Sequence, residues 1–236
     1  MERPEITWIG AHPDNFERGR DGVAFEAIVV HIAEGSLAGI DSWFNDPRAR
    51  ASTHFAVGKG GAIHQYIDLA DTAYGHGAIE PGYTARLIDE NRRQDGVAIS
   101  PNRWAVGIEH EGRSGDAMTR PQFDASTRLA AWLFAAVLIP GGATGVAIDR
   151  DHVLRHGEIS PRSRARCPGY TEEALREYVA RVRELVHGAP AAPDPRMAAR
   201  LRILEDALTV QAAALDDLAA RAAIQAANLR RLVQSG

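Results

Sequence analysis

The stretch Ala27-Ile28-Val29-Val30-His31 is a short apolar run, rich in β-branched residues, that ends in an imidazole. A run of this length and composition predicts a buried strand. Open α/β sheets bind their ligands at the carboxyl ends of strands, so His31 lies where a functional side chain is expected. Strand-like and helix-like segments alternate on either side of this run. The chain is therefore predicted to be an α/β protein with a mixed central β-sheet flanked by helices.

The segments that follow carry start and stop signals of regular structure. Ser36 can cap a helix over residues 37–45, which Pro47 ends. Residues 53–57 and 62–68 have the pattern of two strands joined by a glycine-containing turn, which predicts a β-hairpin.

The segments between residues 78 and 187 predict a long loop, a strand and two helices. Residues 78–103 are rich in Arg, Asp, Asn and Pro, which is typical of a loop that covers a substrate. Thr119-Arg120-Pro121-Gln122 resembles a capping box and predicts a helix that runs through Leu138. The apolar pair Ala147-Ile148 indicates a last strand. A final helix is expected over residues 171–187, closed by a glycine.

Composition narrows the class of protein. The chain has 236 residues, of which 45% are hydrophobic and 25% charged, enough for one α/β core with residues left over. A net charge of −4 gives no general basic surface, so a nucleic-acid partner is not expected. The single cysteine excludes an intramolecular disulfide framework. The sequence contains no apolar run long enough to span a membrane, so a membrane partner is not expected. The first residues lack the pattern of a signal peptide, so synthesis in the cytoplasm without a Sec signal is expected.

Two further residues could join His31 in a metal site. His156 ends the stretch Val153-Leu154-Arg155-His156, and Cys167 stands just before a Pro-Gly pair. Two imidazoles and one thiolate suit zinc, and a catalytic zinc keeps its fourth position for water. His152, four residues before His156, is the alternative for the second ligand position. If this segment were helical, the spacing would place both histidines on one face, where either could bind the metal.

Six segments resemble one known family over roughly residues 20 to 187. They are Ile28-Val29-Val30-His31, Ser52-Thr53-His54-Phe55 with Gly60-Gly61-Ala62-Ile63 behind it, Ala73-Tyr74-Gly75-His76-Gly77, Val106-Gly107-Ile108-Glu109, His156, and Cys167-Pro168-Gly169. In this order they resemble the N-acetylmuramoyl-L-alanine amidase family, which includes phage lysozymes of the amidase type, cytoplasmic muropeptide amidases and peptidoglycan recognition proteins.

The resemblance implies a zinc enzyme that hydrolyses the amide bond between N-acetylmuramic acid and L-alanine in peptidoglycan. It implies that His31, His156 and Cys167 bind Zn²⁺. It also implies that Glu109 is the acid/base residue beside the metal. These roles suit the chemistry, because zinc lowers the pKa of a bound water to about 7 and a nearby carboxylate can take the proton of the attacking water.

Four further residues are expected to contact the substrate. His54 and His76 match family positions that line the cleft. Arg164 and Arg166 lie close to Cys167, and a guanidinium group binds carboxylates such as those of a peptidoglycan stem peptide in a bidentate manner.

The chain departs from the family pattern at two positions. Many members have a lysine two residues before the third ligand, where it stabilises the oxyanion, and this chain has Ala165 there. Some members have a tyrosine where this chain has Thr53. Lysine and arginine are not interchangeable at a tight site, so the sequence leaves open whether Arg164 or Arg166 takes the role of the lysine.

Composition changes sharply after residue 187. Residues 188–195, rich in Pro and Ala, predict a linker between a zinc amidase domain, residues 1–187, and a C-terminal coiled-coil helix, residues 196–236. In the last segment apolar positions recur every seven residues, at Leu201, Leu208, Leu215, Ala222 and Leu229, with a second column at Leu204, Gln211, Leu218, Gln225 and Leu232. Such a helix is marginal when alone in water, so we expect a homo-oligomer formed through residues 196–236. A helix that folds back on the amidase domain, or binds a wall or membrane partner, is the alternative.

These features together predict a phage or prophage endolysin whose partner is peptidoglycan. It would act on the cell wall after release, for example through a holin. A peptidoglycan-binding module without hydrolytic activity is the second candidate, and three intact ligands, Cys167 in particular, favour the enzyme.

Overall fold

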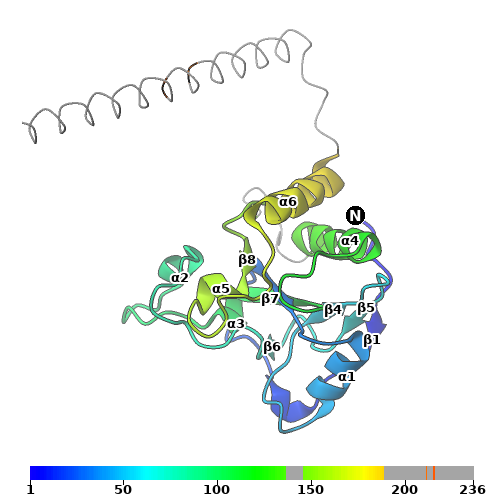
Figure 1. Ribbon diagram of the computed structural model, residues 1–236. Helices are drawn as coiled ribbons and strands as arrows, with labels where there is room; N and C mark the ends of the chain where they lie inside the picture. Colours follow the sequence, from blue (N-terminus) through cyan, green and yellow to red (C-terminus); the bar gives the residue numbers. More distant parts are fainter. Residues whose placement is uncertain (137–145, 189–210, 212–214, 216–236) are drawn as a thin grey trace, which may run out of the picture. The chain divides into compact units, whose positions relative to one another are not determined.

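A six-stranded mixed sheet with strand order β1-β5-β4-β7-β3-β8 lies at the centre of the protein (Figure 1). Its strands in chain order are β1 (Thr7–Trp8), β3 (Ala27–Ile32), β4 (Phe55–Val57), β5 (Ile63–Gln65), β7 (Ala105–His110) and β8 (Val153–Arg155). Strands β4, β7, β3 and β8 are parallel, and β5 pairs antiparallel with β4 as the predicted hairpin. The prediction of an α/β fold with a mixed central sheet is confirmed.

The structure, a computed structural model, describes residues 1–136 and 146–188, together with Gln211 and Leu215. The predicted linker beyond Gly188 and the predicted coiled-coil helix, apart from those two residues, lie outside the described part, as does the expected end of a helix at Leu138. Among the described residues, no helix is both long enough and apolar enough to cross a lipid bilayer.

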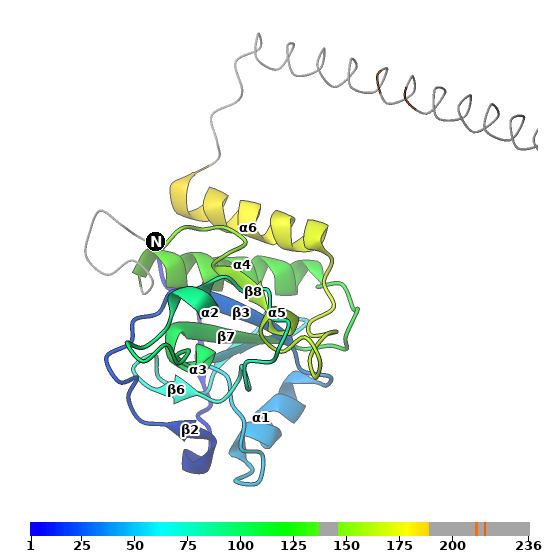
Figure 2. The ribbon, with the colours of Figure 1, turned by 90° about the vertical axis from the view of Figure 1, so that its left-hand side faces the viewer.

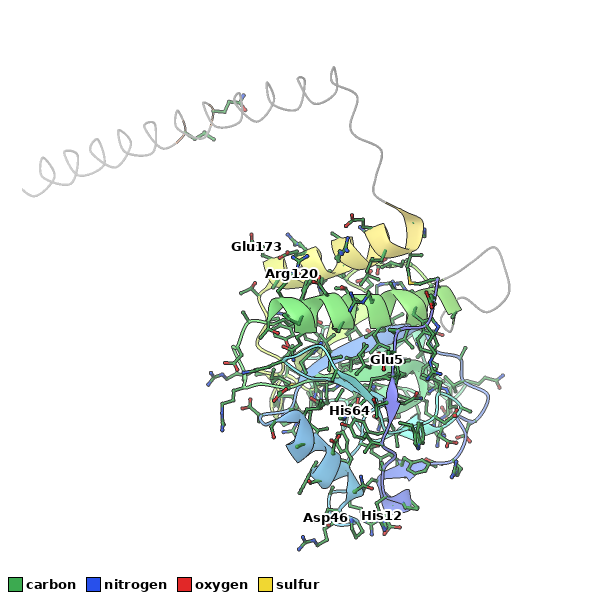
Figure 3. The ribbon with its side chains drawn as sticks, turned by 90° about the vertical axis from the view of Figure 1, so that its right-hand side faces the viewer. Glu5, His12, Asp46, His64, Arg120 and Glu173 are labelled. Carbon is green, nitrogen blue, oxygen red and sulfur yellow. The ribbon has the colours of Figure 1, made fainter. Side chains whose placement is uncertain are left out.

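Helices cover both faces of the sheet, which explains why its central strands β3 and β7 are mostly apolar. Every residue of β3 is buried, as expected for a parallel strand with both faces covered. On one face α4 (Arg120–Ala136) and α6 (Glu172–His187) pack together, and Figure 2 shows them on one side of the sheet with α1 (Leu37–Asn45) on the other. Figure 3 shows that Arg120 and Glu173 lie at the same end of these two helices, so α4 and α6 run in the same direction.

Local capping signals fixed the ends of two helices as predicted. The hydroxyl group of Ser36 accepts a hydrogen bond from the first turn of α1, and that of Thr171 does the same for α6. Gly188 ends α6 with a φ of +84°, a left-handed conformation that favours glycine.

The predicted helix after Thr119 is confirmed, but its capping box is only half formed. The Thr119 hydroxyl accepts a hydrogen bond from the backbone N–H of Gln122 at 3.3 Å. The Gln122 side chain does not close the box, because it donates to the carbonyl groups of Val57 and Glu111 instead. It therefore ties α4 to the ends of β4 and β7.

The prediction of a last strand at Ala147-Ile148 is wrong. These residues lie in a loop, where the Ile148 side chain enters the core without strand pairing. The last strand is β8, which pairs with β3. The apolar pair therefore attaches a loop to the core. An apolar side chain can fill a core position from irregular backbone, so the pair did not require a strand.

The remaining elements are short. They are η1 (Pro13–Asn15), β2 (Phe16–Glu17), β6 (Thr72–Ala73), α2 (Leu87–Glu90), α3 (Pro101–Trp104) and α5 (His156–Ile159). Strands β2 and β6 form a separate antiparallel pair. Helix α2 lies within the predicted long loop of residues 78–103 and α3 begins at its end, so this segment is not wholly irregular backbone.

Candidate metal centre and active site

Three potential metal ligands meet where β3 and β8 end. His31 is the second-last residue of β3, and His156 directly follows the neighbouring parallel strand β8. Cys167 comes from the loop after α5. The Nδ1 atoms of His31 and His156 are 3.0 Å apart, and the Cys167 Sγ atom is 4.0 Å from the His31 Nδ1 atom. Among the described residues these three can offer ligand atoms that all lie within 4.8 Å of one another.

The spacing and the charge state of these groups fit a zinc ion. Tetrahedral zinc holds N and S ligands roughly 3.3 to 3.8 Å from one another. The distances of 3.0 and 4.0 Å lie on either side of this range, so the side chains would shift slightly to bind the ion. Burial, reinforced by the neighbouring imidazoles, lowers the pKa of His31 well below its ordinary value, and burial lowers the pKa of His156 to about 4. Both rings are therefore neutral and can donate a lone pair. Burial also raises the pKa of Cys167 to about 12, so a thiolate there needs a bound cation.

Glu109 is held beside the three ligands by strand register. It lies in β7 directly opposite His31 of β3, so the two side chains point to the same face of the sheet. One carboxylate oxygen of Glu109 is buried and has no hydrogen-bond partner within the described part of the chain. Burial raises the pKa of Glu109 to about 8, against the opposing effect of Arg164. A buried carboxyl group without a protein partner is available to a substrate or a water molecule.

A cavity of about 780 Å³ opens over this cluster. Glu109, His156 and Cys167 line it next to the candidate metal position. Arg164 and Arg166, two of the predicted substrate-binding residues, line it as well. The site therefore combines a metal-binding cluster, a carboxyl group and a cationic wall that can receive carboxylates.

His54 and His76, the other two predicted substrate-binding residues, do not line the cavity. Both are fully buried. The Nδ1 atom of His54 accepts a hydrogen bond from the backbone N–H of Gly107, and its ring packs edge-on against Phe25. The ring of His76 stacks on that of His31, and its Nδ1 atom lies 3.0 Å from the Nε2 atom of His31, whereas the Nδ1 atom of His31 faces His156 and Cys167.

The rival ligand and the two substituted family positions lie outside the cluster. His152 is hydrogen-bonded to Asp149 at 2.6 Å and is not among the grouped ligands. Thr53 is buried, and its side-chain oxygen lies against Gly107. Ala165 does not line the cavity over the cluster. The cationic residues of this loop that do line that cavity are its two neighbours, Arg164 and Arg166.

Sequence reasoning missed the part of the cavity wall that comes from α1 and the segment after it. Trp43 and Arg50 line the cavity, and Trp43 is 52% exposed. The buried Asn15 fixes this wall, since its side chain donates to the carbonyl groups of Phe44 and Asp46 and accepts from the backbone N–H of Arg50. A polar residue early in the chain gives no local signal of contacts so far along the sequence.

Comparisons with known proteins agree with this architecture. The family described as N-acetylmuramoyl-L-alanine amidase matches residues 21–170. N-acetylmuramoyl-L-alanine amidase A of Achromobacter lyticus is 28% identical over 127 residues, which are 53% of this chain and 59% of that protein, so the chain spans less than two thirds of this relative. The crystal structure of a selenomethionine derivative of AmpD has a TM-score of 0.54 at 21% identity, covering 75% of this chain and 99% of the other. A mutant endolysin from Bacillus subtilis has a TM-score of 0.53 at 18% identity, covering 75% and 98%. With the family matched over most of the region that forms the sheet and the site, the chain belongs to the N-acetylmuramoyl-L-alanine amidase family.

Proposed function

We propose that the protein is a zinc-dependent amidase that hydrolyses the bond between N-acetylmuramic acid and L-alanine in peptidoglycan. The observation that carries this proposal is the convergence of His31, His156 and Cys167 beside the carboxyl group of Glu109. Membership of the family supports the reaction class. Zinc held by the three ligands would supply the Lewis acidity that activates water and polarises the scissile carbonyl group.

Glu109 is the residue that we propose moves a proton in the reaction. Its carboxyl group lines the cavity and has an oxygen without a protein partner. It can accept a proton from the attacking water and then protonate the leaving amine of L-alanine. Burial raises the pKa of Glu109 to about 8 in the metal-free site, and the positive charge of a bound zinc ion would lower it again, so the carboxylate would be ionised and able to accept the proton.

The function is tested by incubating the purified protein with peptidoglycan, with and without a metal chelator. We expect newly freed L-alanine amino termini that disappear when the chelator is present. Binding to peptidoglycan without any new amino termini would support the second candidate, a binding module that recognises the wall without cutting it.

We further propose that Arg164 and Arg166 bind carboxylates of the stem peptide. Reversing both charges, Arg164→Glu with Arg166→Glu, should raise the KM for stem-peptide substrates about tenfold or more, since hydrogen bonds to charged groups contribute about 1.5 to 3 kcal/mol each. Steady-state kinetics measure this effect, and metal analysis should show unchanged zinc content. Arg162→Glu is the matched control, because Arg162 lies in the same loop but does not line the cavity. Unchanged KM in the double variant would rule out this role.

A phage or prophage endolysin is the setting that we propose, with assembly through residues 196–236. If the heptad pattern joins several copies, Leu208→Asp with Leu215→Asp should give a monomer by light scattering, because charges then replace leucines in the apolar seam. Turnover of small soluble muropeptides should barely change, because the candidate site lies before residue 170. Activity on intact wall should fall through lost avidity. Deleting residues 196–236 should likewise give a monomer with lower activity on intact wall. A wild-type protein that is already monomeric at micromolar concentration would contradict the assembly.

A further inference from the structure

His76 contacts both histidines of the candidate zinc site, through its ring in one case and its main chain in the other. The His31 Nε2 atom is 3.0 Å from the His76 Nδ1 atom, and the two rings are stacked with their centroids 5.1 Å apart. The His156 Nε2 atom is 3.1 Å from the carbonyl oxygen of His76. His76 is fully buried and does not line the cavity. One residue behind the site therefore reaches the outer nitrogen of each imidazole ligand.

The directions of these hydrogen bonds follow from groups that can only accept. The carbonyl group of Ala105 lies 3.4 Å from the His76 Nε2 atom, so that nitrogen carries the hydrogen. In the neutral ring the His76 Nδ1 atom is then an acceptor, and the hydrogen must come from the His31 Nε2 atom. The carbonyl group of His76 likewise requires a hydrogen on the His156 Nε2 atom.

Each ligand imidazole is thereby left with its lone pair on Nδ1. These two Nδ1 atoms lie 3.0 Å apart, and with both hydrogens on Nε2 neither can donate to the other. Two lone pairs that face each other at this distance are unfavourable unless a cation lies between them. The hydrogen bonds of His76 thus select the ring form of His31 and His156 that a metal ion requires.

Neighbouring residues hold both the backbone and the ring of His76 in place. Its backbone N–H donates to the side-chain oxygen of Asn102 at 2.8 Å. Gly107 of β7 leaves the space for its ring, since a Cβ atom at that position would lie 3.1 Å from the His76 Cε1 atom and 2.4 Å from the Thr53 hydroxyl oxygen. Because its backbone is hydrogen-bonded and its ring fills a closely packed space, His76 is held in one position and is not free to move toward a substrate.

We propose that His76 is a positioning residue that orients His31 and His156 toward Zn²⁺, and that it does not bind substrate. This inference rests on the zinc site of the proposed function. It replaces the role expected from the family resemblance, which placed His76 in contact with the substrate. Partners of this kind change metal affinity by about 10- to 100-fold.

The test is the zinc affinity of full-length variants, measured by competition with a chromophoric chelator. His76→Leu removes the acceptor for His31 but keeps the carbonyl group that His156 uses, and its affinity for zinc should fall about 10- to 100-fold. His54→Leu is the matched control, because His54 is an equally buried histidine with no hydrogen bond to the three ligands in the described structure. Zinc affinity in His54→Leu should equal that of the wild type. An unchanged affinity in His76→Leu, or an equal fall in both variants, would overturn the inference.

A second pair of variants keeps the inference testable if His76→Leu does not fold. The side-chain oxygen of asparagine can occupy the place of Nδ1, whereas the amide of glutamine reaches the place of Nε2. His76→Asn should therefore bind zinc more tightly than His76→Gln, because only asparagine retains an acceptor for His31. Equal affinities, or the reverse order, would contradict the positioning role.

Long-range ¹H–¹⁵N NMR of the zinc-loaded protein gives a readout that a merely structural role would not move. We expect the hydrogen of His31 on Nε2, protected from exchange in the wild type and exchanging faster in His76→Leu. A hydrogen on Nδ1 of His31 would overturn the inference. Failure of the amidase proposal is separable, because a wild-type protein that binds zinc as described but frees no amino termini would disprove only the reaction.

Discussion

Replacing Cys167 by serine or His31 by alanine should abolish both zinc binding and amide hydrolysis. The Cys167 thiol already needs a cation to ionise, since burial raises its pKa to about 12, and a serine hydroxyl group is a still weaker acid and a poorer zinc ligand. His31→Ala removes the ligand that lies 3.0 Å from the Nδ1 atom of His156. Either change leaves two protein ligands, fewer than the three that a catalytic zinc site uses.

Metal analysis of the purified variants decides this prediction, with turnover on peptidoglycan measured alongside. His152→Ala is the matched control, because His152 is the nearest alternative histidine in sequence and is paired with Asp149 instead. It should retain stoichiometric zinc. Stoichiometric zinc in both Cys167→Ser and His31→Ala would show that the ligand set is wrong.

Local signals in the sequence were sufficient for most of the fold. The apolar run ending at His31 became the buried strand β3, Ser36 caps α1 as predicted, and α6 begins where it was expected, after Thr171. Such signals act within one turn or one strand, so they can be seen without knowing the tertiary structure. The pair Ala147-Ile148 misled because burial of one side chain does not require strand pairing.

The layout of the site depended on contacts that local patterns do not contain. The family resemblance grouped His54 and His76 as cleft residues, but packing buries both, and only His76 touches the ligands. The difference arises from tertiary contacts, since His54 meets Phe25 and the backbone of Gly107 whereas His76 meets His31. The wall formed by Trp43 and Arg50 was missed because it depends on the distant Asn15.

Replacing Glu109 by glutamine should lower the rate of hydrolysis about 10²- to 10⁴-fold while zinc content stays normal. Glutamine has nearly the same shape but cannot accept the proton of the attacking water. Glu111→Gln is the matched control, because the Glu111 carboxylate accepts a hydrogen bond from the backbone N–H of Lys59 and does not line the cavity. Near-normal turnover in Glu109→Gln would move the base role to another residue.

The same variant has a second expected effect, on stability, that separates catalysis from folding. Burial raises the pKa of Glu109 from an ordinary 4.5 to about 8 in the metal-free protein, so the folded state holds its proton more tightly than the unfolded state. The stabilisation from that proton is complete below pH 4.5 and is lost as pH rises through 8. Glutamine does not titrate, so the Tm of metal-free Glu109→Gln relative to the wild type should increase between those pH values. A variant that loses activity while gaining relative stability shows that the cavity holds Glu109 for chemistry rather than for folding. A Tm difference that stays constant with pH would instead indicate that the Glu109 carboxyl group is solvated.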